Sequence, residues 1–223
     1  MTAKLYIGTV CKFLFGVVLV GALIFLPAGT LTFFNGWLLM GVLFLPMLLV
    51  GIVMMVKDPA LLQKRLHGKE KEQDQQIVVK LSGLMFVIGF IVAGLGYRFG
   101  WFMVPIGVSV GAAVVLILSY VLYAEVLREN AFLSRTIAVQ EGQRVIDTGL
   151  YGVVRHPMYG ATLFMFLSIP LILGSVYALG VFLAYPLIIA KRIKGEEALL
   201  ERELDGYCNY KERVRYRLIP FVW

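Results

Sequence analysis

Long apolar segments alternate with short polar ones along this chain. Residues 13–56 contain no Asp, Glu, Lys or Arg, residues 81–124 contain only Arg98, and residues 157–190 again contain none. A bilayer core of roughly 30 Å is crossed by about 20 apolar residues in a helix, so each segment is long enough for two crossings. The pattern predicts about six transmembrane helices, or about five if the last hairpin does not fully cross.

Turn-forming residues divide each apolar segment into two helices. The breaks fall at residues 27–30, at residues 96–100 and at Gly174-Ser175. They predict helices over residues 8–27, 34–56, 78–96, 101–126, 158–173 and 176–204, with kinks at Pro170 and Pro186. The expected fold class is therefore all-α, a polytopic integral membrane helical bundle that ends in a helical hairpin.

The composition supports a membrane protein without a separate soluble domain. Of the 223 residues, 60% are hydrophobic and 16% are charged, and the mean hydropathy is +0.83. The polar remainder is too short and too scattered to bury a core of its own. We therefore expect a single membrane domain over residues 1–223. Cys11 and Cys208 lie far apart, and no Cys or His residues have the spacing of metal ligands, so neither a disulfide framework nor a metal is expected.

The basic residues predict how the chain is oriented. With six crossings, every Lys and Arg except Arg98 lies on the side that holds both termini. The positive-inside rule assigns that side to the cytoplasm. The same rule explains the net charge of +7, so nucleic acid is not an expected partner. On this side, Asp58-Pro59 predicts a short amphipathic helix that lies on the lipid interface.

Taken singly, the polar residues near the last hairpin favour structural roles. His156, before the helix expected at 158–173, is typical of a lipid-headgroup or capping residue. Arg192 and Glu196, four positions apart, predict an ion pair on one helix face that is worth a few tenths of a kcal/mol. The acidic residues after them predict a solvated face, and the aromatic residues of the tail predict an interfacial anchor; these are Glu197, Glu201 and Glu203, and Tyr207, Tyr210, Tyr216, Phe221 and Trp223.

The combination of motifs indicates more than the single residues do. Residues 149–159 end in Arg-His-Pro-Met-Tyr, a charge-free hairpin follows, and Arg192 then precedes the pair Glu196-Glu197. Further on come Gly206-Tyr207, Tyr210 and Arg217-Leu218-Ile219-Pro220. Over roughly Asn130 to Pro220 the chain resembles the isoprenylcysteine carboxyl methyltransferase family, within the membrane methyltransferases that include phospholipid N-methyltransferases.

The resemblance implies an enzyme that transfers a methyl group from S-adenosyl-L-methionine. Its cofactor site would lie on the cytoplasmic side, and Arg192 would face the methyl acceptor. The acceptor would be lipophilic, such as a prenylcysteine-type carboxylate. Residues 1–127 would shape the acceptor site, and residues 128–223 would form the methyltransferase-like part. By motif matching, the cofactor contacts would be Gln140, Gln143, Arg144, Val145, Ile146, Tyr151, His156, Pro157, Met158, Tyr159 and Glu196.

Three alternatives remain open at this stage. Methyltransferases related to this family also use small thiols, including methanethiol, or lipid amines as acceptors. Membrane sterol reductases resemble the same C-terminal region but use a reduced nicotinamide dinucleotide. In the third alternative the chain is not an enzyme, and the motif residues only mark the ends of its helices. A methyltransferase would be stabilised by S-adenosyl-L-methionine, a reductase by the reduced dinucleotide, and a protein that is not an enzyme by neither.

Overall fold

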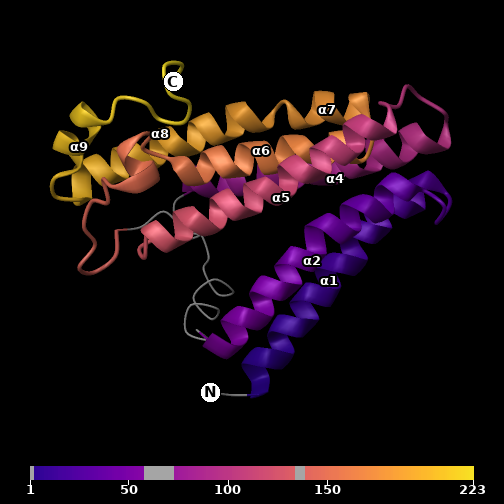
Figure 1. Ribbon diagram of the computed structural model, residues 1–223, viewed down its shortest axis with the longest axis horizontal. Coiled ribbons are helices and arrows are strands. Elements are labelled where there is room, and N and C mark those ends of the chain that lie inside the picture. Colours follow the sequence, from indigo (N-terminus) through magenta and orange to yellow (C-terminus); the bar gives the residue numbers. More distant parts are fainter. Residues whose placement is uncertain (1–2, 58–72, 134–138) are drawn as a thin grey trace.

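A computed structural model describes residues 3–57, 73–133 and 139–223, which form helices joined by loops (Figure 1). Beside the helices, the described residues include an isolated β-bridge between Met103 and Ser175. The predicted all-α class is confirmed. The elements are α1 (Ala3–Ala28), α2 (Phe34–Lys57), α4 (Gln73–Arg98), α5 (Ile106–Glu129), the 3₁₀ helix η1 (Gly149–Gly152), α6 (Pro157–Ile172), α7 (Val176–Phe182), α8 (Tyr185–Glu203) and α9 (Tyr207–Arg213).

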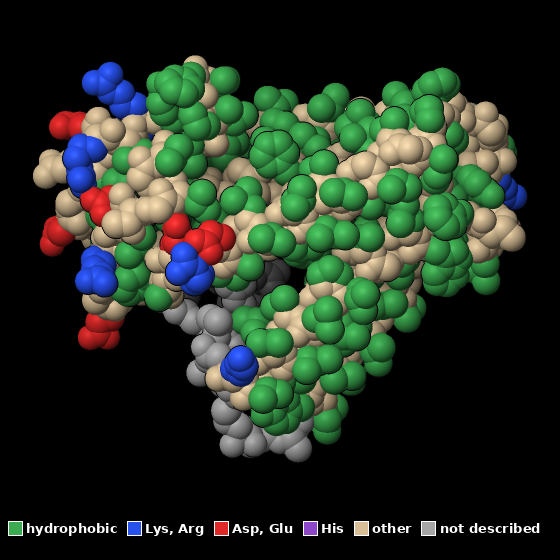
Figure 2. Space-filling view, in the orientation of Figure 1, with side chains coloured by type: hydrophobic (Ala, Val, Ile, Leu, Met, Phe, Trp, Pro, Cys, Tyr) green, Lys and Arg blue, Asp and Glu red, His purple; other side chains and the backbone are tan. Residues whose placement is uncertain are grey.

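The lengths and surface of these helices are those of an integral membrane protein. In the described residues, five helical segments are long and apolar enough to cross a bilayer, the last of them running through α7 and α8. Helix α6 is also apolar but has only 16 residues. In the view of Figures 1 and 2, hydrophobic side chains cover the long sides of the molecule, and most of the visible charged ones gather at the end that holds α9. By length, the described residues supply the lower of the two expected numbers of spans. The shorter α6 makes a further pass, because the turn that follows it lies beside the start of α5 through the Met103–Ser175 bridge.

Most helix boundaries lie close to the predicted breaks. Helix α1 ends at Ala28 and α4 ends at Arg98. Between α6 and α7, Gly174 adopts a φ of +75°, which favours glycine. The next residue, Ser175, is the N-cap of α7, and its side-chain oxygen accepts a hydrogen bond from the Ala178 N–H at 3.1 Å. The predicted turn at Gly174-Ser175 is confirmed.

Two predicted helices differ from the structure because of proline. The helix expected from residue 101 begins only at Ile106, after Pro105. Before it the chain is extended, and the Val104 N–H donates to the Gly174 carbonyl at 2.9 Å. The helix expected over residues 176–204 is interrupted between Phe182 and Tyr185. Pro186 has no N–H to donate to the Phe182 carbonyl, so the expected kink becomes a break between α7 and α8.

Polar side chains form hydrogen bonds with the last carbonyl groups of α6 inside the bundle. The Ser109 hydroxyl on α5 donates to the Leu171 carbonyl at 2.9 Å. The Asn35 amide on α2 donates to the Ile172 carbonyl at 2.8 Å and to the Ser109 hydroxyl at 2.9 Å. In lipid, the last carbonyls of a helix must find such partners within the protein. Asn35 and Ser109 thereby join α2 and α5 to the turn of the last hairpin.

Helices α1 and α2 form a pair that diverges from the other helices toward the N-terminus (Figure 1). Near the turn between α1 and α2, the pair packs closely on α4. A Cβ added at Gly94 on α4 would lie 2.5 Å from the Ile24 carbonyl oxygen on α1. Only glycine therefore permits this crossing of α1 and α4. The helix expected after Asp58-Pro59 lies outside the described residues.

Candidate active site

A cavity lies at the charged end of the molecule, next to the last helices. Its walls come from residues 130–133 and 143–146, from η1, from the start of α6, from α8, and from Leu204 and α9. The space between these walls, counted together with its open mouth, is about 820 Å³. Segments far apart in the sequence therefore meet around one space.

Most of the residues singled out from the sequence line this cavity. They are Gln143, Arg144, Val145, Ile146, Tyr151, His156, Met158, Tyr159, Arg192 and Glu196. Gln140 and Pro157 are not among the lining residues. The Gln140 N–H donates to Gln143 Oε1 at 2.9 Å, and its side-chain amide donates to the Phe132 carbonyl, so it shapes the loop. Pro157 is buried as the first residue of α6, where a missing N–H costs nothing.

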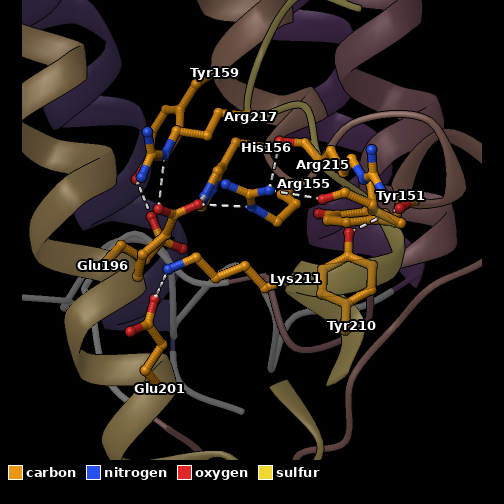
Figure 3. A network of polar contacts seen from close by, with 12 residues as sticks. Tyr151, Arg155, His156, Tyr159, Glu196, Glu201, Tyr210, Lys211, Arg215 and Arg217 are labelled. Atoms are coloured by element: carbon orange, nitrogen blue, oxygen red, sulfur yellow. Dashed lines mark hydrogen bonds and ion pairs between the residues drawn. The ribbon is translucent and has the colours of Figure 1, made fainter. Parts of the chain in front are cut away.

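The Tyr159 hydroxyl links the two charged groups of α8 that face the cavity. It donates to Glu196 Oε2 at 2.6 Å (Figure 3), and it accepts from Arg192 Nε at 3.0 Å. Arg192 Nη1 also donates to Gln75 Oε1, on α4, at 3.4 Å. Both charged side chains are half-buried. Arg192 and Glu196 therefore belong to a network across three helices, rather than to the solvated helix face expected from their spacing alone.

Glu197 contradicts the prediction of a solvated acidic face. Its residue is only 3% exposed, and its carboxylate accepts from Arg155 Nε and Arg217 Nε, each at 2.8 Å. His156 Nε2 lies 3.3 Å from the same carboxylate. A buried carboxylate needs such partners because burial removes its water. The prediction failed because Arg155 and Arg217 approach α8 only in the folded chain.

The same contacts fasten the C-terminal tail beside the cavity. The Arg155 guanidinium donates to the Val214 and Arg215 carbonyls at 2.6 and 2.8 Å. The main-chain N–H groups of Arg155 and His156 donate to the Tyr216 and Arg217 carbonyls, both at 2.9 Å. His156 occupies the N-cap position of α6, but its side chain makes no capping hydrogen bond. Its ring instead forms part of the cavity wall.

The short helix η1 positions Tyr151. The Leu150 N–H donates to both carboxylate oxygens of Glu129, at 2.9 and 3.2 Å. Gly149 adopts a φ of +54°, and a Cβ there would lie 1.8 Å from Glu129 Oε1. The Tyr151 carbonyl accepts from the Tyr210 hydroxyl at 2.7 Å (Figure 3). Burial raises the pKa of Tyr151 to about 12, so its phenol stays neutral at physiological pH.

The tail tyrosines are the main feature that sequence reasoning missed. Tyr207 and Tyr210 are buried and line the cavity, so they do not form part of an interfacial anchor. The sequence feature that indicates their position is the turn residue Gly206, which Tyr207 follows directly. Tyr210 comes three positions after Tyr207, and this spacing places both rings on one helix face. Burial raises the pKa of each phenol above its usual value. The other lining residues not singled out are Asn130, Phe132, Leu133, Arg155, Leu199, Leu200 and Leu204.

Comparisons with known proteins agree with this fold and with the position of the motifs. Residues 110–202 match the model of the isoprenylcysteine carboxyl methyltransferase family. The solved structure of a eukaryotic intramembrane Ras methyltransferase of this name shares the fold, with a TM-score of 0.53, 19% identity, and coverage of 97% of this chain and 86% of that one.

A curated relative matches over a shorter stretch. The Delta(14)-sterol reductase of Mus musculus is 31% identical over 91 residues, which is 40% of this chain. The matched stretch spans only 22% of the reductase.

Fold and site together define an integral membrane protein of helical-bundle type whose cavity opens at its charged end. The family match includes α6, α7 and nearly all of α8, which carry Tyr159, Arg192 and Glu196. Over residues 110–202 the chain is similar to the isoprenylcysteine carboxyl methyltransferase family, and its fold resembles that of the solved Ras methyltransferase.

Proposed function

We propose that this protein is a methyltransferase that uses S-adenosyl-L-methionine and methylates the carboxylate of a lipophilic, prenylcysteine-type acceptor. The observation that carries the proposal is the cavity, which brings together the residues that the family motifs single out, except Gln140 and Pro157. The family match supports the reaction class. The cofactor and the acceptor are those that the resemblance to this family implies, and the lining residues are chemically suited to both.

The donor set of the cavity suits S-adenosyl-L-methionine. Glu196 supplies a negative charge for the ammonium and sulfonium groups, and Tyr151 and Tyr159 supply aromatic faces that attract a cation. Arg144 and Gln143 also line the cavity and can donate hydrogen bonds to oxygen atoms of the cofactor. When bound, the cofactor supplies a methyl group on a positively charged sulfur, and its transfer to a carboxylate breaks one C–S bond and forms one C–O bond.

The acceptor site is proposed to begin at Arg192. This residue precedes Glu196 by about one helical turn. It therefore lies nearer the N-terminal end of α8, which connects to α7 and the apolar part of the bundle. A planar guanidinium can hold a carboxylate through two parallel hydrogen bonds. The Tyr159 hydroxyl and Gln75 fix the direction of that guanidinium. An apolar acceptor tail could then remain among the membrane helices while its carboxylate reaches the cavity.

No residue of the chain needs to act as a general base for this acceptor. A carboxyl group with a pKa near 4 is already ionised at neutral pH. The protein would instead hold the carboxylate close to the methyl group and exclude water. In this scheme residues 128–223 form the catalytic part and residues 1–127 shape the path of the acceptor. We place the cavity and both termini in the cytoplasm, because of the distribution of Lys and Arg.

Transfer of radiolabelled methyl from S-adenosyl-L-methionine by the purified full chain tests the proposal. The acceptor panel contains a farnesylated cysteine analogue, methanethiol and an aminolipid. We expect label in the farnesylated analogue, in a product that base hydrolysis releases as methanol. Label only in the thiol or the amine would overturn the acceptor, and label in none of the three would overturn the reaction.

A second candidate follows from the match to the sterol reductase. In that case the cavity would hold a reduced nicotinamide dinucleotide instead. Beside Glu196 the lining contains Arg144, Arg155 and Arg192, and such guanidinium groups can pair with the two phosphates of that ligand. Titration with each of the two cofactors separates the candidates.

A further inference from the structure

Tyr207 carries a hydroxyl group that the protein itself does not satisfy. The residue is 4% exposed and lines the cavity. Among the described residues, its hydroxyl is the buried side-chain polar atom without a hydrogen-bond partner. A buried hydroxyl without a partner costs about 1–3 kcal/mol, so it is rarely left unsatisfied without a reason.

Its neighbour Tyr210 makes an informative contrast. The two rings lie 5.8 Å apart, on the same face of α9. The Tyr210 hydroxyl donates to the Tyr151 carbonyl at 2.7 Å and thereby fastens η1 to α9 (Figure 3). Tyr210 therefore has a structural role that Tyr207 lacks. The hydroxyl of Tyr207 is left available for a molecule in the cavity.

The surroundings of Tyr207 show which part of a ligand would reach it. Leu204, Tyr207, Tyr210 and Val214 form an apolar cluster, against which Val145 and Leu200 pack. The cavity also carries polar groups from α6 and α8, namely Tyr159, Arg192 and Glu196. Its lining therefore has an apolar end beside α9 and a polar end formed by α6 and the middle of α8.

We propose that the Tyr207 hydroxyl forms a hydrogen bond with the nucleoside part of the cofactor, which would lie at the apolar end. The inference rests on the proposed function. A purine has two apolar faces, which fit among leucine, valine and tyrosine side chains, whereas its edge and the ribose carry polar groups that need partners. The charged amino-acid part of the cofactor then reaches the polar end, where Glu196 lies.

Two ligands separate the two ends of the cavity. S-adenosylhomocysteine contains both the nucleoside and the amino-acid part, whereas 5′-methylthioadenosine contains the nucleoside without the amino-acid part. In calorimetric titrations, we expect Tyr207→Phe to weaken both ligands by the same factor, about fivefold or more. Glu196→Gln should weaken S-adenosylhomocysteine only. The melting temperature of ligand-free Tyr207→Phe should not fall, because the lost hydroxyl has no partner in the protein.

Tyr210→Phe is the matched control, since it removes the same atom from a ring in the same helix. It should lower the melting temperature of the ligand-free protein, because the bond to the Tyr151 carbonyl is lost. Unchanged affinity of Tyr207→Phe for both ligands would overturn the inference, as would a loss for S-adenosylhomocysteine alone. A fall in melting temperature equal to that of Tyr210→Phe would make the hydroxyl structural and overturn it as well. Absence of binding to the wild type would instead contradict the proposed function itself.

Discussion

Arg155 and Glu197 form a buried ion pair, with 2.8 Å between Nε and Oε1, that joins the segment before α6 to the middle of α8. Their side chains are 4% and 3% exposed. Nη1 of Arg155 donates to the Val214 and Arg215 carbonyls of the tail, and Nε of Arg217 donates to the other oxygen of Glu197. The pair therefore holds three segments together at the wall of the cavity.

Glu197→Gln should destabilise the protein strongly. The change leaves Arg155 buried without its counter-charge, and breaking a buried pair typically costs about 3–5 kcal/mol. Thermal unfolding of the detergent-solubilised protein measures the effect. Glu203→Gln is the control, because Glu203 is exposed on the same helix and pairs with the exposed Arg202. Similar melting temperatures for the two variants would contradict the structural role of Glu197.

Arg192→Lys should separate acceptor binding from cofactor binding. Lysine keeps the charge but loses the planar fork, so we expect methyl transfer to fall about tenfold, or about 1.4 kcal/mol. The dissociation constant of S-adenosylhomocysteine should stay near that of the wild type. Lys194→Arg, at an exposed position of the same helix, is the control and should leave the rate unchanged. Normal turnover in Arg192→Lys would remove the acceptor role from this residue.

Gly149→Ala should loosen η1 and the cavity wall that contains Tyr151. The new methyl group would collide with Glu129 and displace it from the Leu150 N–H. Gly142→Ala is a matched control, since Gly142 has a φ of +70° with open space around its Cβ position. Both variants bear the strain of a left-handed residue, about 1–2 kcal/mol, but only Gly149→Ala also loses the Glu129 contact. Equal losses of stability and ligand affinity in the two variants would disprove the contribution of that contact.

Cysteine labelling in intact cells tests the orientation. With Cys11 and Cys208 replaced by serine, a cysteine at Glu141 should be reached by reagents only from the cytoplasm. Cysteines at Gly29 and Arg98 should be reached only from the opposite side. The structure places these two together, since a Cβ at Gly29 would lie 3.5 Å from the Arg98 guanidinium. Labelling of Arg98→Cys from the cytoplasm alone would contradict the orientation drawn from the basic residues.

The helices could largely be predicted from the sequence, because hydrophobic length is a local property. The breaks at Gly174-Ser175 and after Ala28 were visible as turn residues. The interruption before Tyr185 could be predicted only as a kink, because the sequence does not show how far the chain departs from a helix at Pro186. The packing of α1 on α4 through Gly94 depends on a close approach that no local pattern reveals.

The cavity was predicted in part, and through family resemblance rather than local pattern. Tyr159, Arg192 and Glu196 were singled out by the motifs, and the structure brings them together. Glu197 was interpreted as solvated because helical spacing shows which residues share a face but not what packs against it. Tyr207 was assigned to an anchor because aromatic residues near a membrane commonly lie at the interface. Both errors arose where distant segments cover α8 and α9.

The most direct test of the central claim is calorimetric titration of the purified full chain with S-adenosylhomocysteine and, separately, with a reduced nicotinamide dinucleotide. We predict saturable binding of S-adenosylhomocysteine that Glu196→Gln weakens, and no binding of the dinucleotide. Binding of the dinucleotide without binding of S-adenosylhomocysteine would contradict the methyltransferase account and favour the reductase.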